Sequence, residues 1–326
     1  MKKRYDVLGV GIAAVDDLKY VAEYPPVDCK IPVSASTRQG GGPACTAIAA
    51  AGVLGGRAAY VARFGNNELS HYMRSALASR GVDTSHIVDD AAGGPYHSII
   101  VVDSAGHRNV FYDPALYRTV TEDDLPGALI QSAQICLLDH ITEPSLLTVA
   151  EKVRRLSVPI VSDIEGRTSS AQQLVQLTDY LILPKAFAAW ASGEINARDA
   201  CVSLARTPRL ATIVTDGAAG CYACSAADPA VRHFSAFQVQ AFDTTGCGDT
   251  FHGAFALAVA RQLSTEDAIL FASAAAALKA MAAGGQRRGW DALPTLTEVI
   301  GFLQSRLEEP QESSLLPRIH SALAPG

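Results

Sequence analysis

The sequence predicts an α/β fold in which a mostly parallel β-sheet is flanked by helices and carries a small β-sheet lid. From residue 57 onward, short apolar runs typical of buried strands alternate with segments typical of helices. This alternation favours a parallel sheet covered by helices on both faces. Residues 17–39 interrupt the pattern with two extended segments joined by a polar turn. We interpret these two segments as lid strands that project from the main body.

The individual elements follow from the same patterns. Residues 5–10 are mostly apolar and predict the first strand. A helix is predicted at 43–54, because proline is favoured at the first helical position and the residues after Pro43 are small and apolar. The other expected strands are 57–63, 98–103, 109–112, 135–138, 159–163, 180–183, 212–215 and a hairpin within 221–240, and the other expected helices are 67–80, 146–156, 171–177, 186–191, 249–262, 265–284 and 295–308.

The chain divides into one large unit and two smaller parts. We expect residues 1–16 and 40–308 to form the α/β domain, with a hairpin near 96–113 adding to the lid. Residues 17–39 supply the first lid strands. Residues 309–326 contain prolines, serines and charges without a clear period, so we expect a peripheral C-terminal tail.

Composition narrows the classes of function. The 326 residues are 48% hydrophobic and carry a net charge of −6 without a basic block, which argues against a nucleic-acid partner. No apolar run reaches the length of a membrane span, so no membrane partner is expected. The seven cysteines are scattered, and Cys221-x-x-Cys224 lacks the second pair or nearby histidines of a metal site. This cysteine usage fits a reducing cytoplasm best.

Four aspartates lie just past predicted strand ends. They are Asp16, Asp139, Asp163 and Asp216. Ligands of open α/β sheets bind beyond the carboxyl ends of the strands. We therefore expect these acidic side chains to converge on one rim of the sheet.

The stretch Ala241–Phe255 carries the clearest chemical pattern. Asp243–Thr245 suits a turn or a helix N-cap, Gly246–Gly248 follows, and Asp249 precedes an alanine-rich apolar run. This order predicts a glycine turn leading into a helix N-terminus, where unpaired N–H groups and the helix dipole favour a phosphate. We predict that Asp249 is a general base and that the Gly246–Gly248 amides form an anion hole. The alternative is an ordinary surface helix with an acidic first turn.

Two glycine-rich segments near the N-terminus suggest ligand contacts. Gly40–Gly42 precedes the helix at Pro43, and glycines let a ligand approach the backbone closely. A tight structural loop is the alternative. Gly9-Val-Gly11-Ile-Ala-Ala14 follows the first strand and matches a GxGxxA form of the dinucleotide fingerprint. An NAD-binding protein is therefore a rival function, although residues 16–26 look extended rather than helical.

Asp243-Thr-Thr-Gly-Cys-Gly-Asp249 resembles the D-T-x-G-A-G-D signature of the ribokinase-like (PfkB) carbohydrate kinases, with Cys247 in place of the usual alanine. Gly40–Gly42 resembles the other signature of that family, and the turn Thr215-x-Gly217-x-x-Gly220 fits it as well. The resemblance covers nearly the whole chain, up to about residue 305.

The resemblance implies a Rossmann-like α/β domain whose β-sheet lid often serves as a dimer clasp, and hence a homodimer. It implies ATP- and Mg²⁺-dependent phosphorylation of a sugar-like alcohol, and it leaves open a monovalent cation such as K⁺. By the family pattern, Asp249 takes the proton of the attacking hydroxyl. The amides of Gly246, Cys247 and Gly248 stabilise the transferring phosphoryl group, in keeping with the physics of phosphoryl transfer.

The expected ligand contacts form two sets. Asp139 is favoured for its strand-end position, and Lys30 could meet an anionic head group, with a solvated lysine as the alternative. The candidate sugar contacts are Asp16, Lys30, Gly41, Gly42, Thr46 and Asp139. The candidate nucleotide contacts are Thr215, Gly217, Gly220, Thr245, Gly246, Gly248 and Gly285.

The chain departs from the family pattern at two functional motifs. Pro43 and Thr46 stand where the family often has an Asn or Lys and then an Asn, so sugar recognition must differ. The N-x-x-E motif linked to Mg²⁺ is replaced by Leu183–Phe187. The metal would then rely on waters, ATP oxygens and an acid such as Asp163 or Glu165.

The segment Gly40–Thr46, with Lys30 upstream, looks most like the branch that contains ketohexokinases and sulfofructose kinases. That branch phosphorylates a primary hydroxyl of a ketose. The leading hypothesis is therefore an ATP-dependent kinase for a primary hydroxyl of a small sugar or sugar derivative. The second is a non-catalytic sugar or nucleoside sensor on a kinase fold. The intact Asp249 argues against the sensor, and the missing N-x-x-E motif argues for it.

Overall fold

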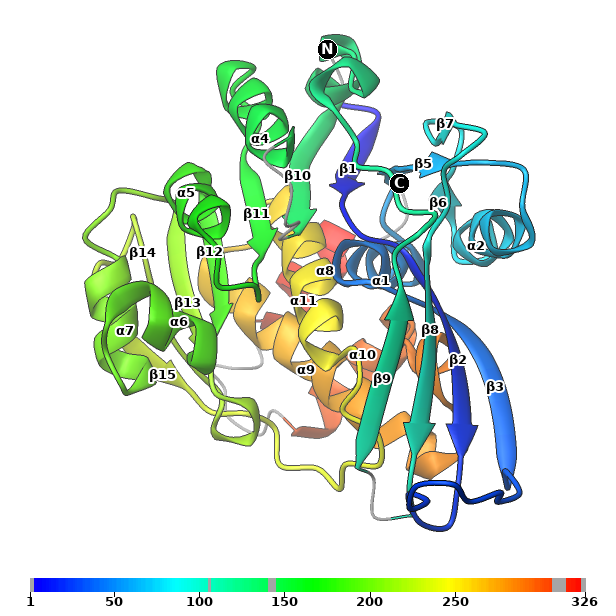
Figure 1. Cartoon of the computed structure of the whole chain (residues 1–326). Helices are drawn as coiled ribbons and strands as arrows, with labels where there is room; N and C mark the ends of the chain where they lie inside the picture. The colour runs from blue at the N-terminus through cyan, green and yellow to red at the C-terminus, as the bar shows by residue number, and fades with distance from the viewer. Residues whose placement is uncertain (1–2, 105–106, 140–144, 307–314, 324–326) are drawn as a thin grey trace.

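The main body of the protein is one large β-sheet with helices on both faces (Figure 1). The computed structural model describes residues 3–104, 107–139, 145–306 and 315–323. Within these residues the sheet has nine strands. Neighbouring strands are parallel except at one edge, where β14 pairs antiparallel with both β13 and β15. Its order is β15 (Arg232–Phe234), β14 (Cys221–Ser225), β13 (Ala211–Thr215), β12 (Tyr180–Pro184), β11 (Ile160–Asp163), β10 (Ala133–Asp139), β1 (Tyr5–Val10), β4 (Ala58–Val61) and β6 (Val82–Asp83). The predicted α/β architecture is confirmed.

Two apolar cores lie on opposite faces of this sheet, because successive strand side chains point to opposite sides. Val7 and Ile135 face one core, and Leu8 and Cys136 face the other. The first core is covered by α1 (Pro43–Val53), α2 (Glu68–Ala78), α8 (Cys247–Ala260) and α9 (Thr265–Gly285), with α10 (Leu296–Arg306) on α9 and α11 (Leu315–Leu323) on α10. The second core is covered by α3 (Gly127–Gln131), α4 (Ser145–Arg155), α5 (Ser169–Leu177), α6 (Lys185–Ser192) and α7 (Ala197–Leu204).

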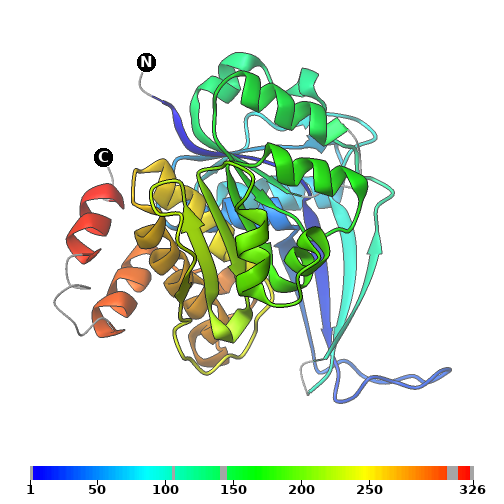
Figure 2. The same ribbon diagram turned by 90° about the vertical axis from the view of Figure 1, so that its left-hand side faces the viewer.

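A separate four-stranded sheet projects from the body as the lid (Figures 1 and 2). Its order is β3 (Ala35–Gly41), β2 (Ala14–Tyr20), β8 (Tyr96–Val102) and β9 (Arg108–Asp113). β8 and β9 form the predicted hairpin, and β8 pairs in parallel with β2. The connection at residues 21–34 extends away from the body (Figure 2). A third, two-stranded sheet joins β5 (Arg63–Phe64) to β7 (Val88–Asp89).

The lid strands differ from their predicted bounds. β2 begins at Ala14 and β3 ends at Gly41, so these two lid strands extend beyond the predicted range 17–39 at both ends. Asp16 therefore lies within a lid strand, and the prediction that it follows a body strand is wrong. The side-chain pattern alone could not locate this boundary, because residues 11–13 lead from β1 straight into β2. Only its pairing with β3 and β8 assigns β2 to the lid sheet.

The predicted helices are all present, but α3, α7 and α11 were not expected. α11 falls within the predicted tail, of which residues 309–314 and 324–326 lie outside the described part. Ile319 and Leu323 are buried, and Arg318 pairs with Asp267 on α9, so this helix packs against the body. The described helices include no candidate for a membrane-spanning segment.

Candidate active site

The N-terminus of α8 forms the predicted glycine turn. Gly246 is the N-cap and has φ 76°, a left-handed conformation that glycine adopts without strain. Its carbonyl accepts from the Thr250 N–H at 2.9 Å and from Thr250 Oγ1 at 2.7 Å. The Cys247 N–H donates to the Thr244 carbonyl at 3.2 Å. Within the described residues the Gly246 and Gly248 amides have no acceptor, so two of the three predicted anion-hole amides are available to a ligand.

Asp249, in the first turn of α8, lines a cavity of about 220 Å³ at the base of the lid. We call this the acidic cavity, because Asp16, Glu165 and Asp249 all line it. Burial, followed by the charge of Asp163, raises the pKa of Asp249 well above its usual range. Asp163 is hydrogen-bonded to Asp249, and burial raises the Asp163 pKa as well. A carboxylate with this increased proton affinity is better suited to accept a hydroxyl proton than a surface aspartate.

His252 holds the start of α8 against the sheet. Its Nδ1 lies 2.9 Å from the Gly248 carbonyl and 3.3 Å from Asp163 Oδ2, and its Nε2 lies 3.2 Å from the Ile182 carbonyl. The ring is buried. The two hydrogen bonds tie the turn at the start of α8 to β12.

Asp16 reaches the acidic cavity from the lid. Its side chain accepts hydrogen bonds from Ser98 and Gln39, and burial raises its pKa. A Cβ added at Gly41 would lie 2.2 Å from Asp16 Oδ2, so the glycine makes room for this carboxylate. Asp16 and Gly41 are therefore brought to the cavity together, as predicted, although Asp16 arrives on a lid strand.

Thr46 and Gly42 line the body side of the acidic cavity. Trp290 Nε1 donates to Thr46 Oγ1 at 3.0 Å, which leaves the hydroxyl proton of Thr46 for another acceptor. Gly42 has φ 89°, and a Cβ there would lie 2.2 Å from the Ile12 carbonyl oxygen. Only glycine fits this junction between lid and helix α1.

A second cavity, of about 380 Å³, lies on the other side of the α8 N-terminus. We call it the apolar cavity, because Phe237, Val239, Phe251 and alanines of α9 contribute to its walls. The predicted nucleotide contacts Thr215, Gly217, Gly220 and Gly248 all line it, together with Thr244 and Cys247.

Three predicted nucleotide contacts lie elsewhere. Thr245 and Gly246 line the acidic cavity. Gly285 has φ 82° and lines neither cavity, and a Cβ there would lie 3.0 Å from the Phe242 ring. Gly285 thus packs the end of α9 against the loop before α8.

The dinucleotide fingerprint at residues 9–14 forms no nucleotide site. β1 ends at Val10 and β2 begins at Ala14, so no helix N-terminus follows the glycines. The fingerprint needs such an N-terminus to bind a pyrophosphate. Gly11 instead makes room for Asp139, whose Cγ would lie 2.4 Å from an added Cβ. The NAD-binding alternative is therefore wrong.

Residues 6–292 match the pfkB family of carbohydrate kinases. The chain belongs to this family. It is 26% identical to the ribokinase of Haemophilus influenzae over 272 residues, which are 81% of this chain and 87% of that enzyme. It is 31% identical to the fructokinase of Klebsiella pneumoniae over 229 residues, 65% of this chain and 74% of that one. The Arabidopsis thaliana ribokinase structure, in complex with ribose and ATP, superposes with a TM-score of 0.77 at 21% identity and covers 93% of this chain and 99% of its own.

The chain is thus a sugar kinase, an enzyme that transfers a phosphoryl group to an alcohol. These relatives are ribokinases and fructokinases, and they do not single out the ketohexokinase and sulfofructose kinase branch. The family assignment agrees with the resemblance carried by the motifs at Gly40–Gly42 and Asp243–Asp249.

Several acidic candidates of this kinase do not reach either cavity. Asp139 is fully buried, and its Oδ2 accepts from the Ile12 N–H at 2.7 Å and the Ala44 N–H at 3.1 Å. It secures the lid junction to α1, so the geometry does not support a sugar contact. Asp216 pairs with Lys185 Nζ at 2.9 Å, outside both cavities. Of the four aspartates predicted to share one rim of the sheet, only Asp139 and Asp163 lie side by side, at the ends of β10 and β11.

Lys30 also lies away from the acidic cavity. It is exposed on the connection between β2 and β3 and lines neither cavity. Its side chain lies beyond the strands of the lid sheet and is exposed to solvent. Charge recognition by Lys30 therefore has no support in this arrangement.

Asp139→Asn is expected to remove one source of pH dependence from folding stability. Burial raises the pKa of Asp139 to about 7, so between pH ~4 and ~7 the folded protein binds more protons than the unfolded chain. Wild-type stability should therefore fall as the pH rises through this window. Asparagine can still accept both N–H groups and does not ionise. Melting temperatures from pH 5 to 8 should show a gain for the variant that grows with pH, to a few degrees. A constant difference across this range would contradict the raised pKa.

The metal candidates occupy different positions. Glu165 is exposed and lines the acidic cavity, whereas Asp163 is buried behind Asp249. Among the residues that the structure describes, no group of three or more His, Cys, Asp or Glu side chains could hold a metal ion on its own. Carboxylate oxygens supplemented by phosphate oxygens and water suit Mg²⁺, so Glu165 fits such a role in part.

Four residues of the site were missed by sequence reasoning. Gln39, Lys279 and Trp290 line the acidic cavity, whereas His252 lines the apolar cavity and contacts Asp163. Lys279 had a signal, since it is a lone cation in the apolar second half of α9. The other three are ordinary strand, helix and loop residues, and only the fold brings them to the two cavities.

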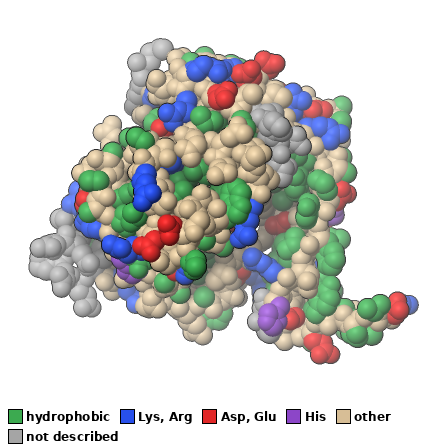
Figure 3. All heavy atoms as spheres, turned by 60° about the vertical axis from the view of Figure 1, so that its left-hand side comes forward, with side chains coloured by type: hydrophobic (Ala, Val, Ile, Leu, Met, Phe, Trp, Pro, Cys, Tyr) green, Lys and Arg blue, Asp and Glu red, His purple; other side chains and the backbone are tan. Residues whose placement is uncertain are grey.

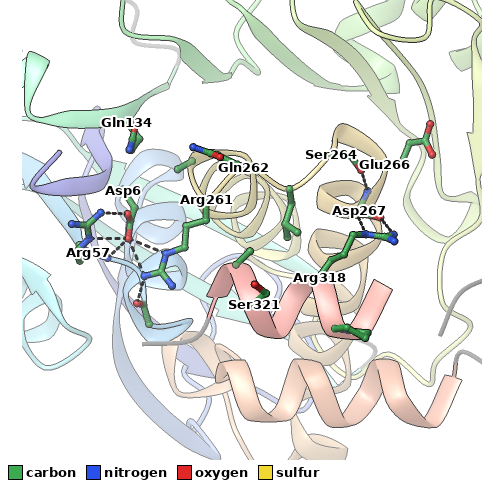
Figure 4. Close-up of a pocket in the computed structure, with 15 residues that line it drawn as sticks. Asp6, Arg57, Gln134, Arg261, Gln262, Ser264, Glu266, Asp267, Arg318 and Ser321 are labelled. Carbon is green, nitrogen blue, oxygen red and sulfur yellow. Dashed lines mark hydrogen bonds and ion pairs between the residues drawn. The ribbon is translucent and has the colours of Figure 1, made fainter. Parts of the chain in front are cut away.

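Another hollow, of about 1320 Å³, lies between the ends of α8, α9 and α11 (Figure 4). Most of its charged groups are paired with one another, and Glu266 pairs with Arg232 on β15. Asp6 binds Arg57 and Arg261, and Asp267 binds Arg318 (Figure 4). These pairs join α11 to α9 and the start of β1 to the end of α8, and we assign no ligand to this hollow.

Proposed function

We propose that this protein is an ATP-dependent kinase that transfers the γ-phosphoryl group to a primary hydroxyl of a small sugar or sugar derivative. One observation carries the proposal. The N-terminus of α8 separates the two cavities, with Thr245, Gly246 and Asp249 on the acidic side and Cys247 and Gly248 on the apolar side. A sugar in one cavity and an adenine nucleotide in the other would meet at this helix end, where anions are favoured.

In the proposed reaction, the sugar hydroxyl gives its proton to the Asp249 carboxylate. Its oxygen forms the new bond to the γ-phosphorus, the bond to the bridging oxygen breaks, and ADP leaves with that electron pair. The Gly246 and Gly248 amides donate hydrogen bonds to the phosphoryl oxygens. The raised pKa of Asp249 gives it the proton affinity that this step requires.

The sugar would be held by groups from both sheets. The Asp16 carboxylate accepts hydrogen bonds from sugar hydroxyls, the Thr46 hydroxyl donates one, and Gly41 and Gly42 allow the sugar to lie against the backbone. The acidic cavity, of about 220 Å³, shares Asp16, Glu165 and Thr245 with a larger hollow of about 1040 Å³ that the lid strands line, so its volume does not set the size of the sugar. The ketose branch stays a prediction, because none of these groups distinguishes a ketose from an aldose.

The nucleotide would lie along Thr215, Gly217 and Gly220, with its base between apolar side chains of the apolar cavity. Mg²⁺ would bind ATP oxygens, waters and the Glu165 carboxylate, and it supplies charge neutralisation at the phosphates. Cys247 remains a neutral thiol, because burial raises its pKa to about 11. A requirement for a monovalent cation such as K⁺ stays a prediction.

ADP release with a panel of ketoses, aldoses, sugar acids and nucleosides tests the proposed function. The expected result is MgATP-dependent turnover with one class of small sugar. The sensor alternative predicts a rise in melting temperature with a sugar but no ADP release. That outcome would overturn the kinase proposal.

We also propose that the lid forms a homodimer. Hydrophobic side chains gather along the lid (Figure 3), and on the lid face away from Asp16 the paired residues Ile99 and Phe111 are 44% and 54% exposed. A second copy of the same sheet would bury these side chains. Light scattering after size-exclusion chromatography should show a dimer that Phe111→Asp converts to monomer. Ile195→Asp, at an exposed residue of the body, should leave the dimer intact. A monomeric wild-type protein would contradict this proposal.

A further inference from the structure

Lys279 is a buried cation in an apolar setting. It lies in the second half of α9, among small and apolar residues. The residue is 1% exposed, and Nζ has no hydrogen-bond partner within the described part of the protein. Its ion pair with Asp243 Oδ2 spans 3.8 Å, which is too long for a hydrogen bond. The three N–H donors of this ammonium group are therefore unused.

Such burial destabilises the folded protein. The ammonium group loses its hydration, and one long ion pair compensates for only part of that loss. A methionine of similar volume would fill the same space without a charge. Incompletely paired buried charges of this kind are typical of functional sites.

The end of the Lys279 side chain reaches the acidic cavity. Lys279 lines this cavity together with Gly246 and Asp249. A Cβ added at Gly246 would lie 3.8 Å from Lys279 Cε. The ammonium group therefore lies near the turn that carries the two free amides.

Two cations, Arg108 and Lys279, line the acidic cavity, and Arg108 Nη1 donates to Thr245 Oγ1. Asp16, Glu165 and Asp249 are acidic, and a phosphoryl group at the α8 N-terminus would add further negative charge. Of the cations that line the cavity, Arg108 is exposed on lid strand β9. Lys279 is held by the body, in the same element that packs along α8. Its position does not depend on how the lid is placed.

We propose that Lys279 is a catalytic residue whose ammonium group contacts the phosphoryl group as it crosses the N-terminus of α8. This proposal rests on the proposed kinase function. A cation held in place before the reaction stabilises the developing charge without reorganisation. The Gly246 and Gly248 amides supply hydrogen bonds, and Lys279 supplies a full charge. Phosphoryl oxygens would satisfy the donors that are unused in the structure.

Lys279→Met tests this role. The expected result is a decrease in kcat of about 10²- to 10³-fold, with a KM for the sugar within about threefold of wild type. The melting temperature should stay equal or rise, because a buried charge is removed. In Lys279→Ala, added ethylammonium should restore part of kcat. Lys152→Met is the matched control, since Lys152 Nζ bonds the Glu122 carbonyl on another face, and kcat should not change.

A binding measurement separates this proposal from the kinase proposal. MgADP with fluoroaluminate, a mimic of the transferring phosphoryl group, should raise the wild-type melting temperature more than MgADP alone. Lys279→Met should lose this extra increase and keep the MgADP effect. An unchanged kcat, or an equal fluoroaluminate effect in both proteins, would overturn the role of Lys279. So would a large drop in melting temperature of the variant, which would make the lysine structural. If wild type showed no turnover but still gained more melting temperature from fluoroaluminate than Lys279→Met, only the kinase proposal would be overturned.

Discussion

Asp249→Asn is expected to lower kcat by about 10²- to 10⁴-fold and to leave KM nearly unchanged. Asparagine has the same size as aspartate but cannot accept the hydroxyl proton. The α8 N-terminus and both cavities should persist, so MgADP should still raise the melting temperature. Glu266→Gln is the matched control, because it removes an acidic residue from the first turn of α9, and its kcat should equal that of wild type. Full activity in Asp249→Asn would show that the base is another group.

The pH profile of kcat tests the same base without a substitution. Burial and the charge of Asp163 raise the pKa of Asp249, so its protonated form persists to a higher pH than that of a surface aspartate. Activity should be full above this raised pKa and should fall as the pH falls through it. The acid limb should therefore lie well above pH ~4, where an ordinary aspartate titrates. An acid limb near pH ~4 would contradict the buried-pair geometry.

Asp16→Asn is expected to lower kcat/KM for the sugar by about 10- to 100-fold, mainly through KM. A hydrogen bond to a charged group contributes roughly 1.5–3 kcal/mol, and the amide replaces one acceptor oxygen by a donor. Ser98 and Gln39 would still surround the side chain and keep its position. Steady-state kinetics at varied sugar and saturating ATP measure this effect. An unchanged KM would remove Asp16 from the sugar site.

The neighbour Asp17 provides a matched control on the opposite face of β2. It binds Arg38 and His97, each at 2.8 Å, and the Arg38 guanidinium holds its pKa at about 2. Asp17→Asn should leave kcat/KM unchanged and reduce stability at neutral pH, because a carboxylate with a lowered pKa stabilises the fold above about pH 4. The pKa of Asp16 is raised by burial, so its ionised form destabilises the fold at neutral pH. Asp16→Asn should therefore keep or raise the melting temperature, the opposite of Asp17→Asn.

The local parts of the site could be predicted from the sequence. The turn at Gly246, the start of α8 and the glycines before Pro43 depend on backbone preferences within a few residues. Such preferences follow from the residue type at each position. Gly246, for example, has a φ of 76°, which glycine adopts without strain. The βα alternation likewise predicted the parallel sheet, because strand and helix periods differ.

The long-range parts could not be predicted in this way. Asp139 ends a strand, as predicted, but its carboxylate turns to the amides of Ile12 and Ala44, which no local pattern indicates. Asp16 was placed on the wrong sheet, because strand pairing rather than sequence decides which sheet a strand joins. Lys279 lies 30 residues after Asp249 in the chain and meets the same cavity only because α8 and α9 pack against each other.

Short motifs and periodic burial were enough to predict the family, the α/β fold and the glycine turn at the start of α8. Only the folded chain shows which charges share the acidic cavity. It brings Asp16 and Lys279 to the same cavity as Asp249 and places Asp139 and Lys30 outside it. The pKa and the accessibility of a charged group depend on its neighbours in space, and those neighbours come from strands and helices far apart in the chain.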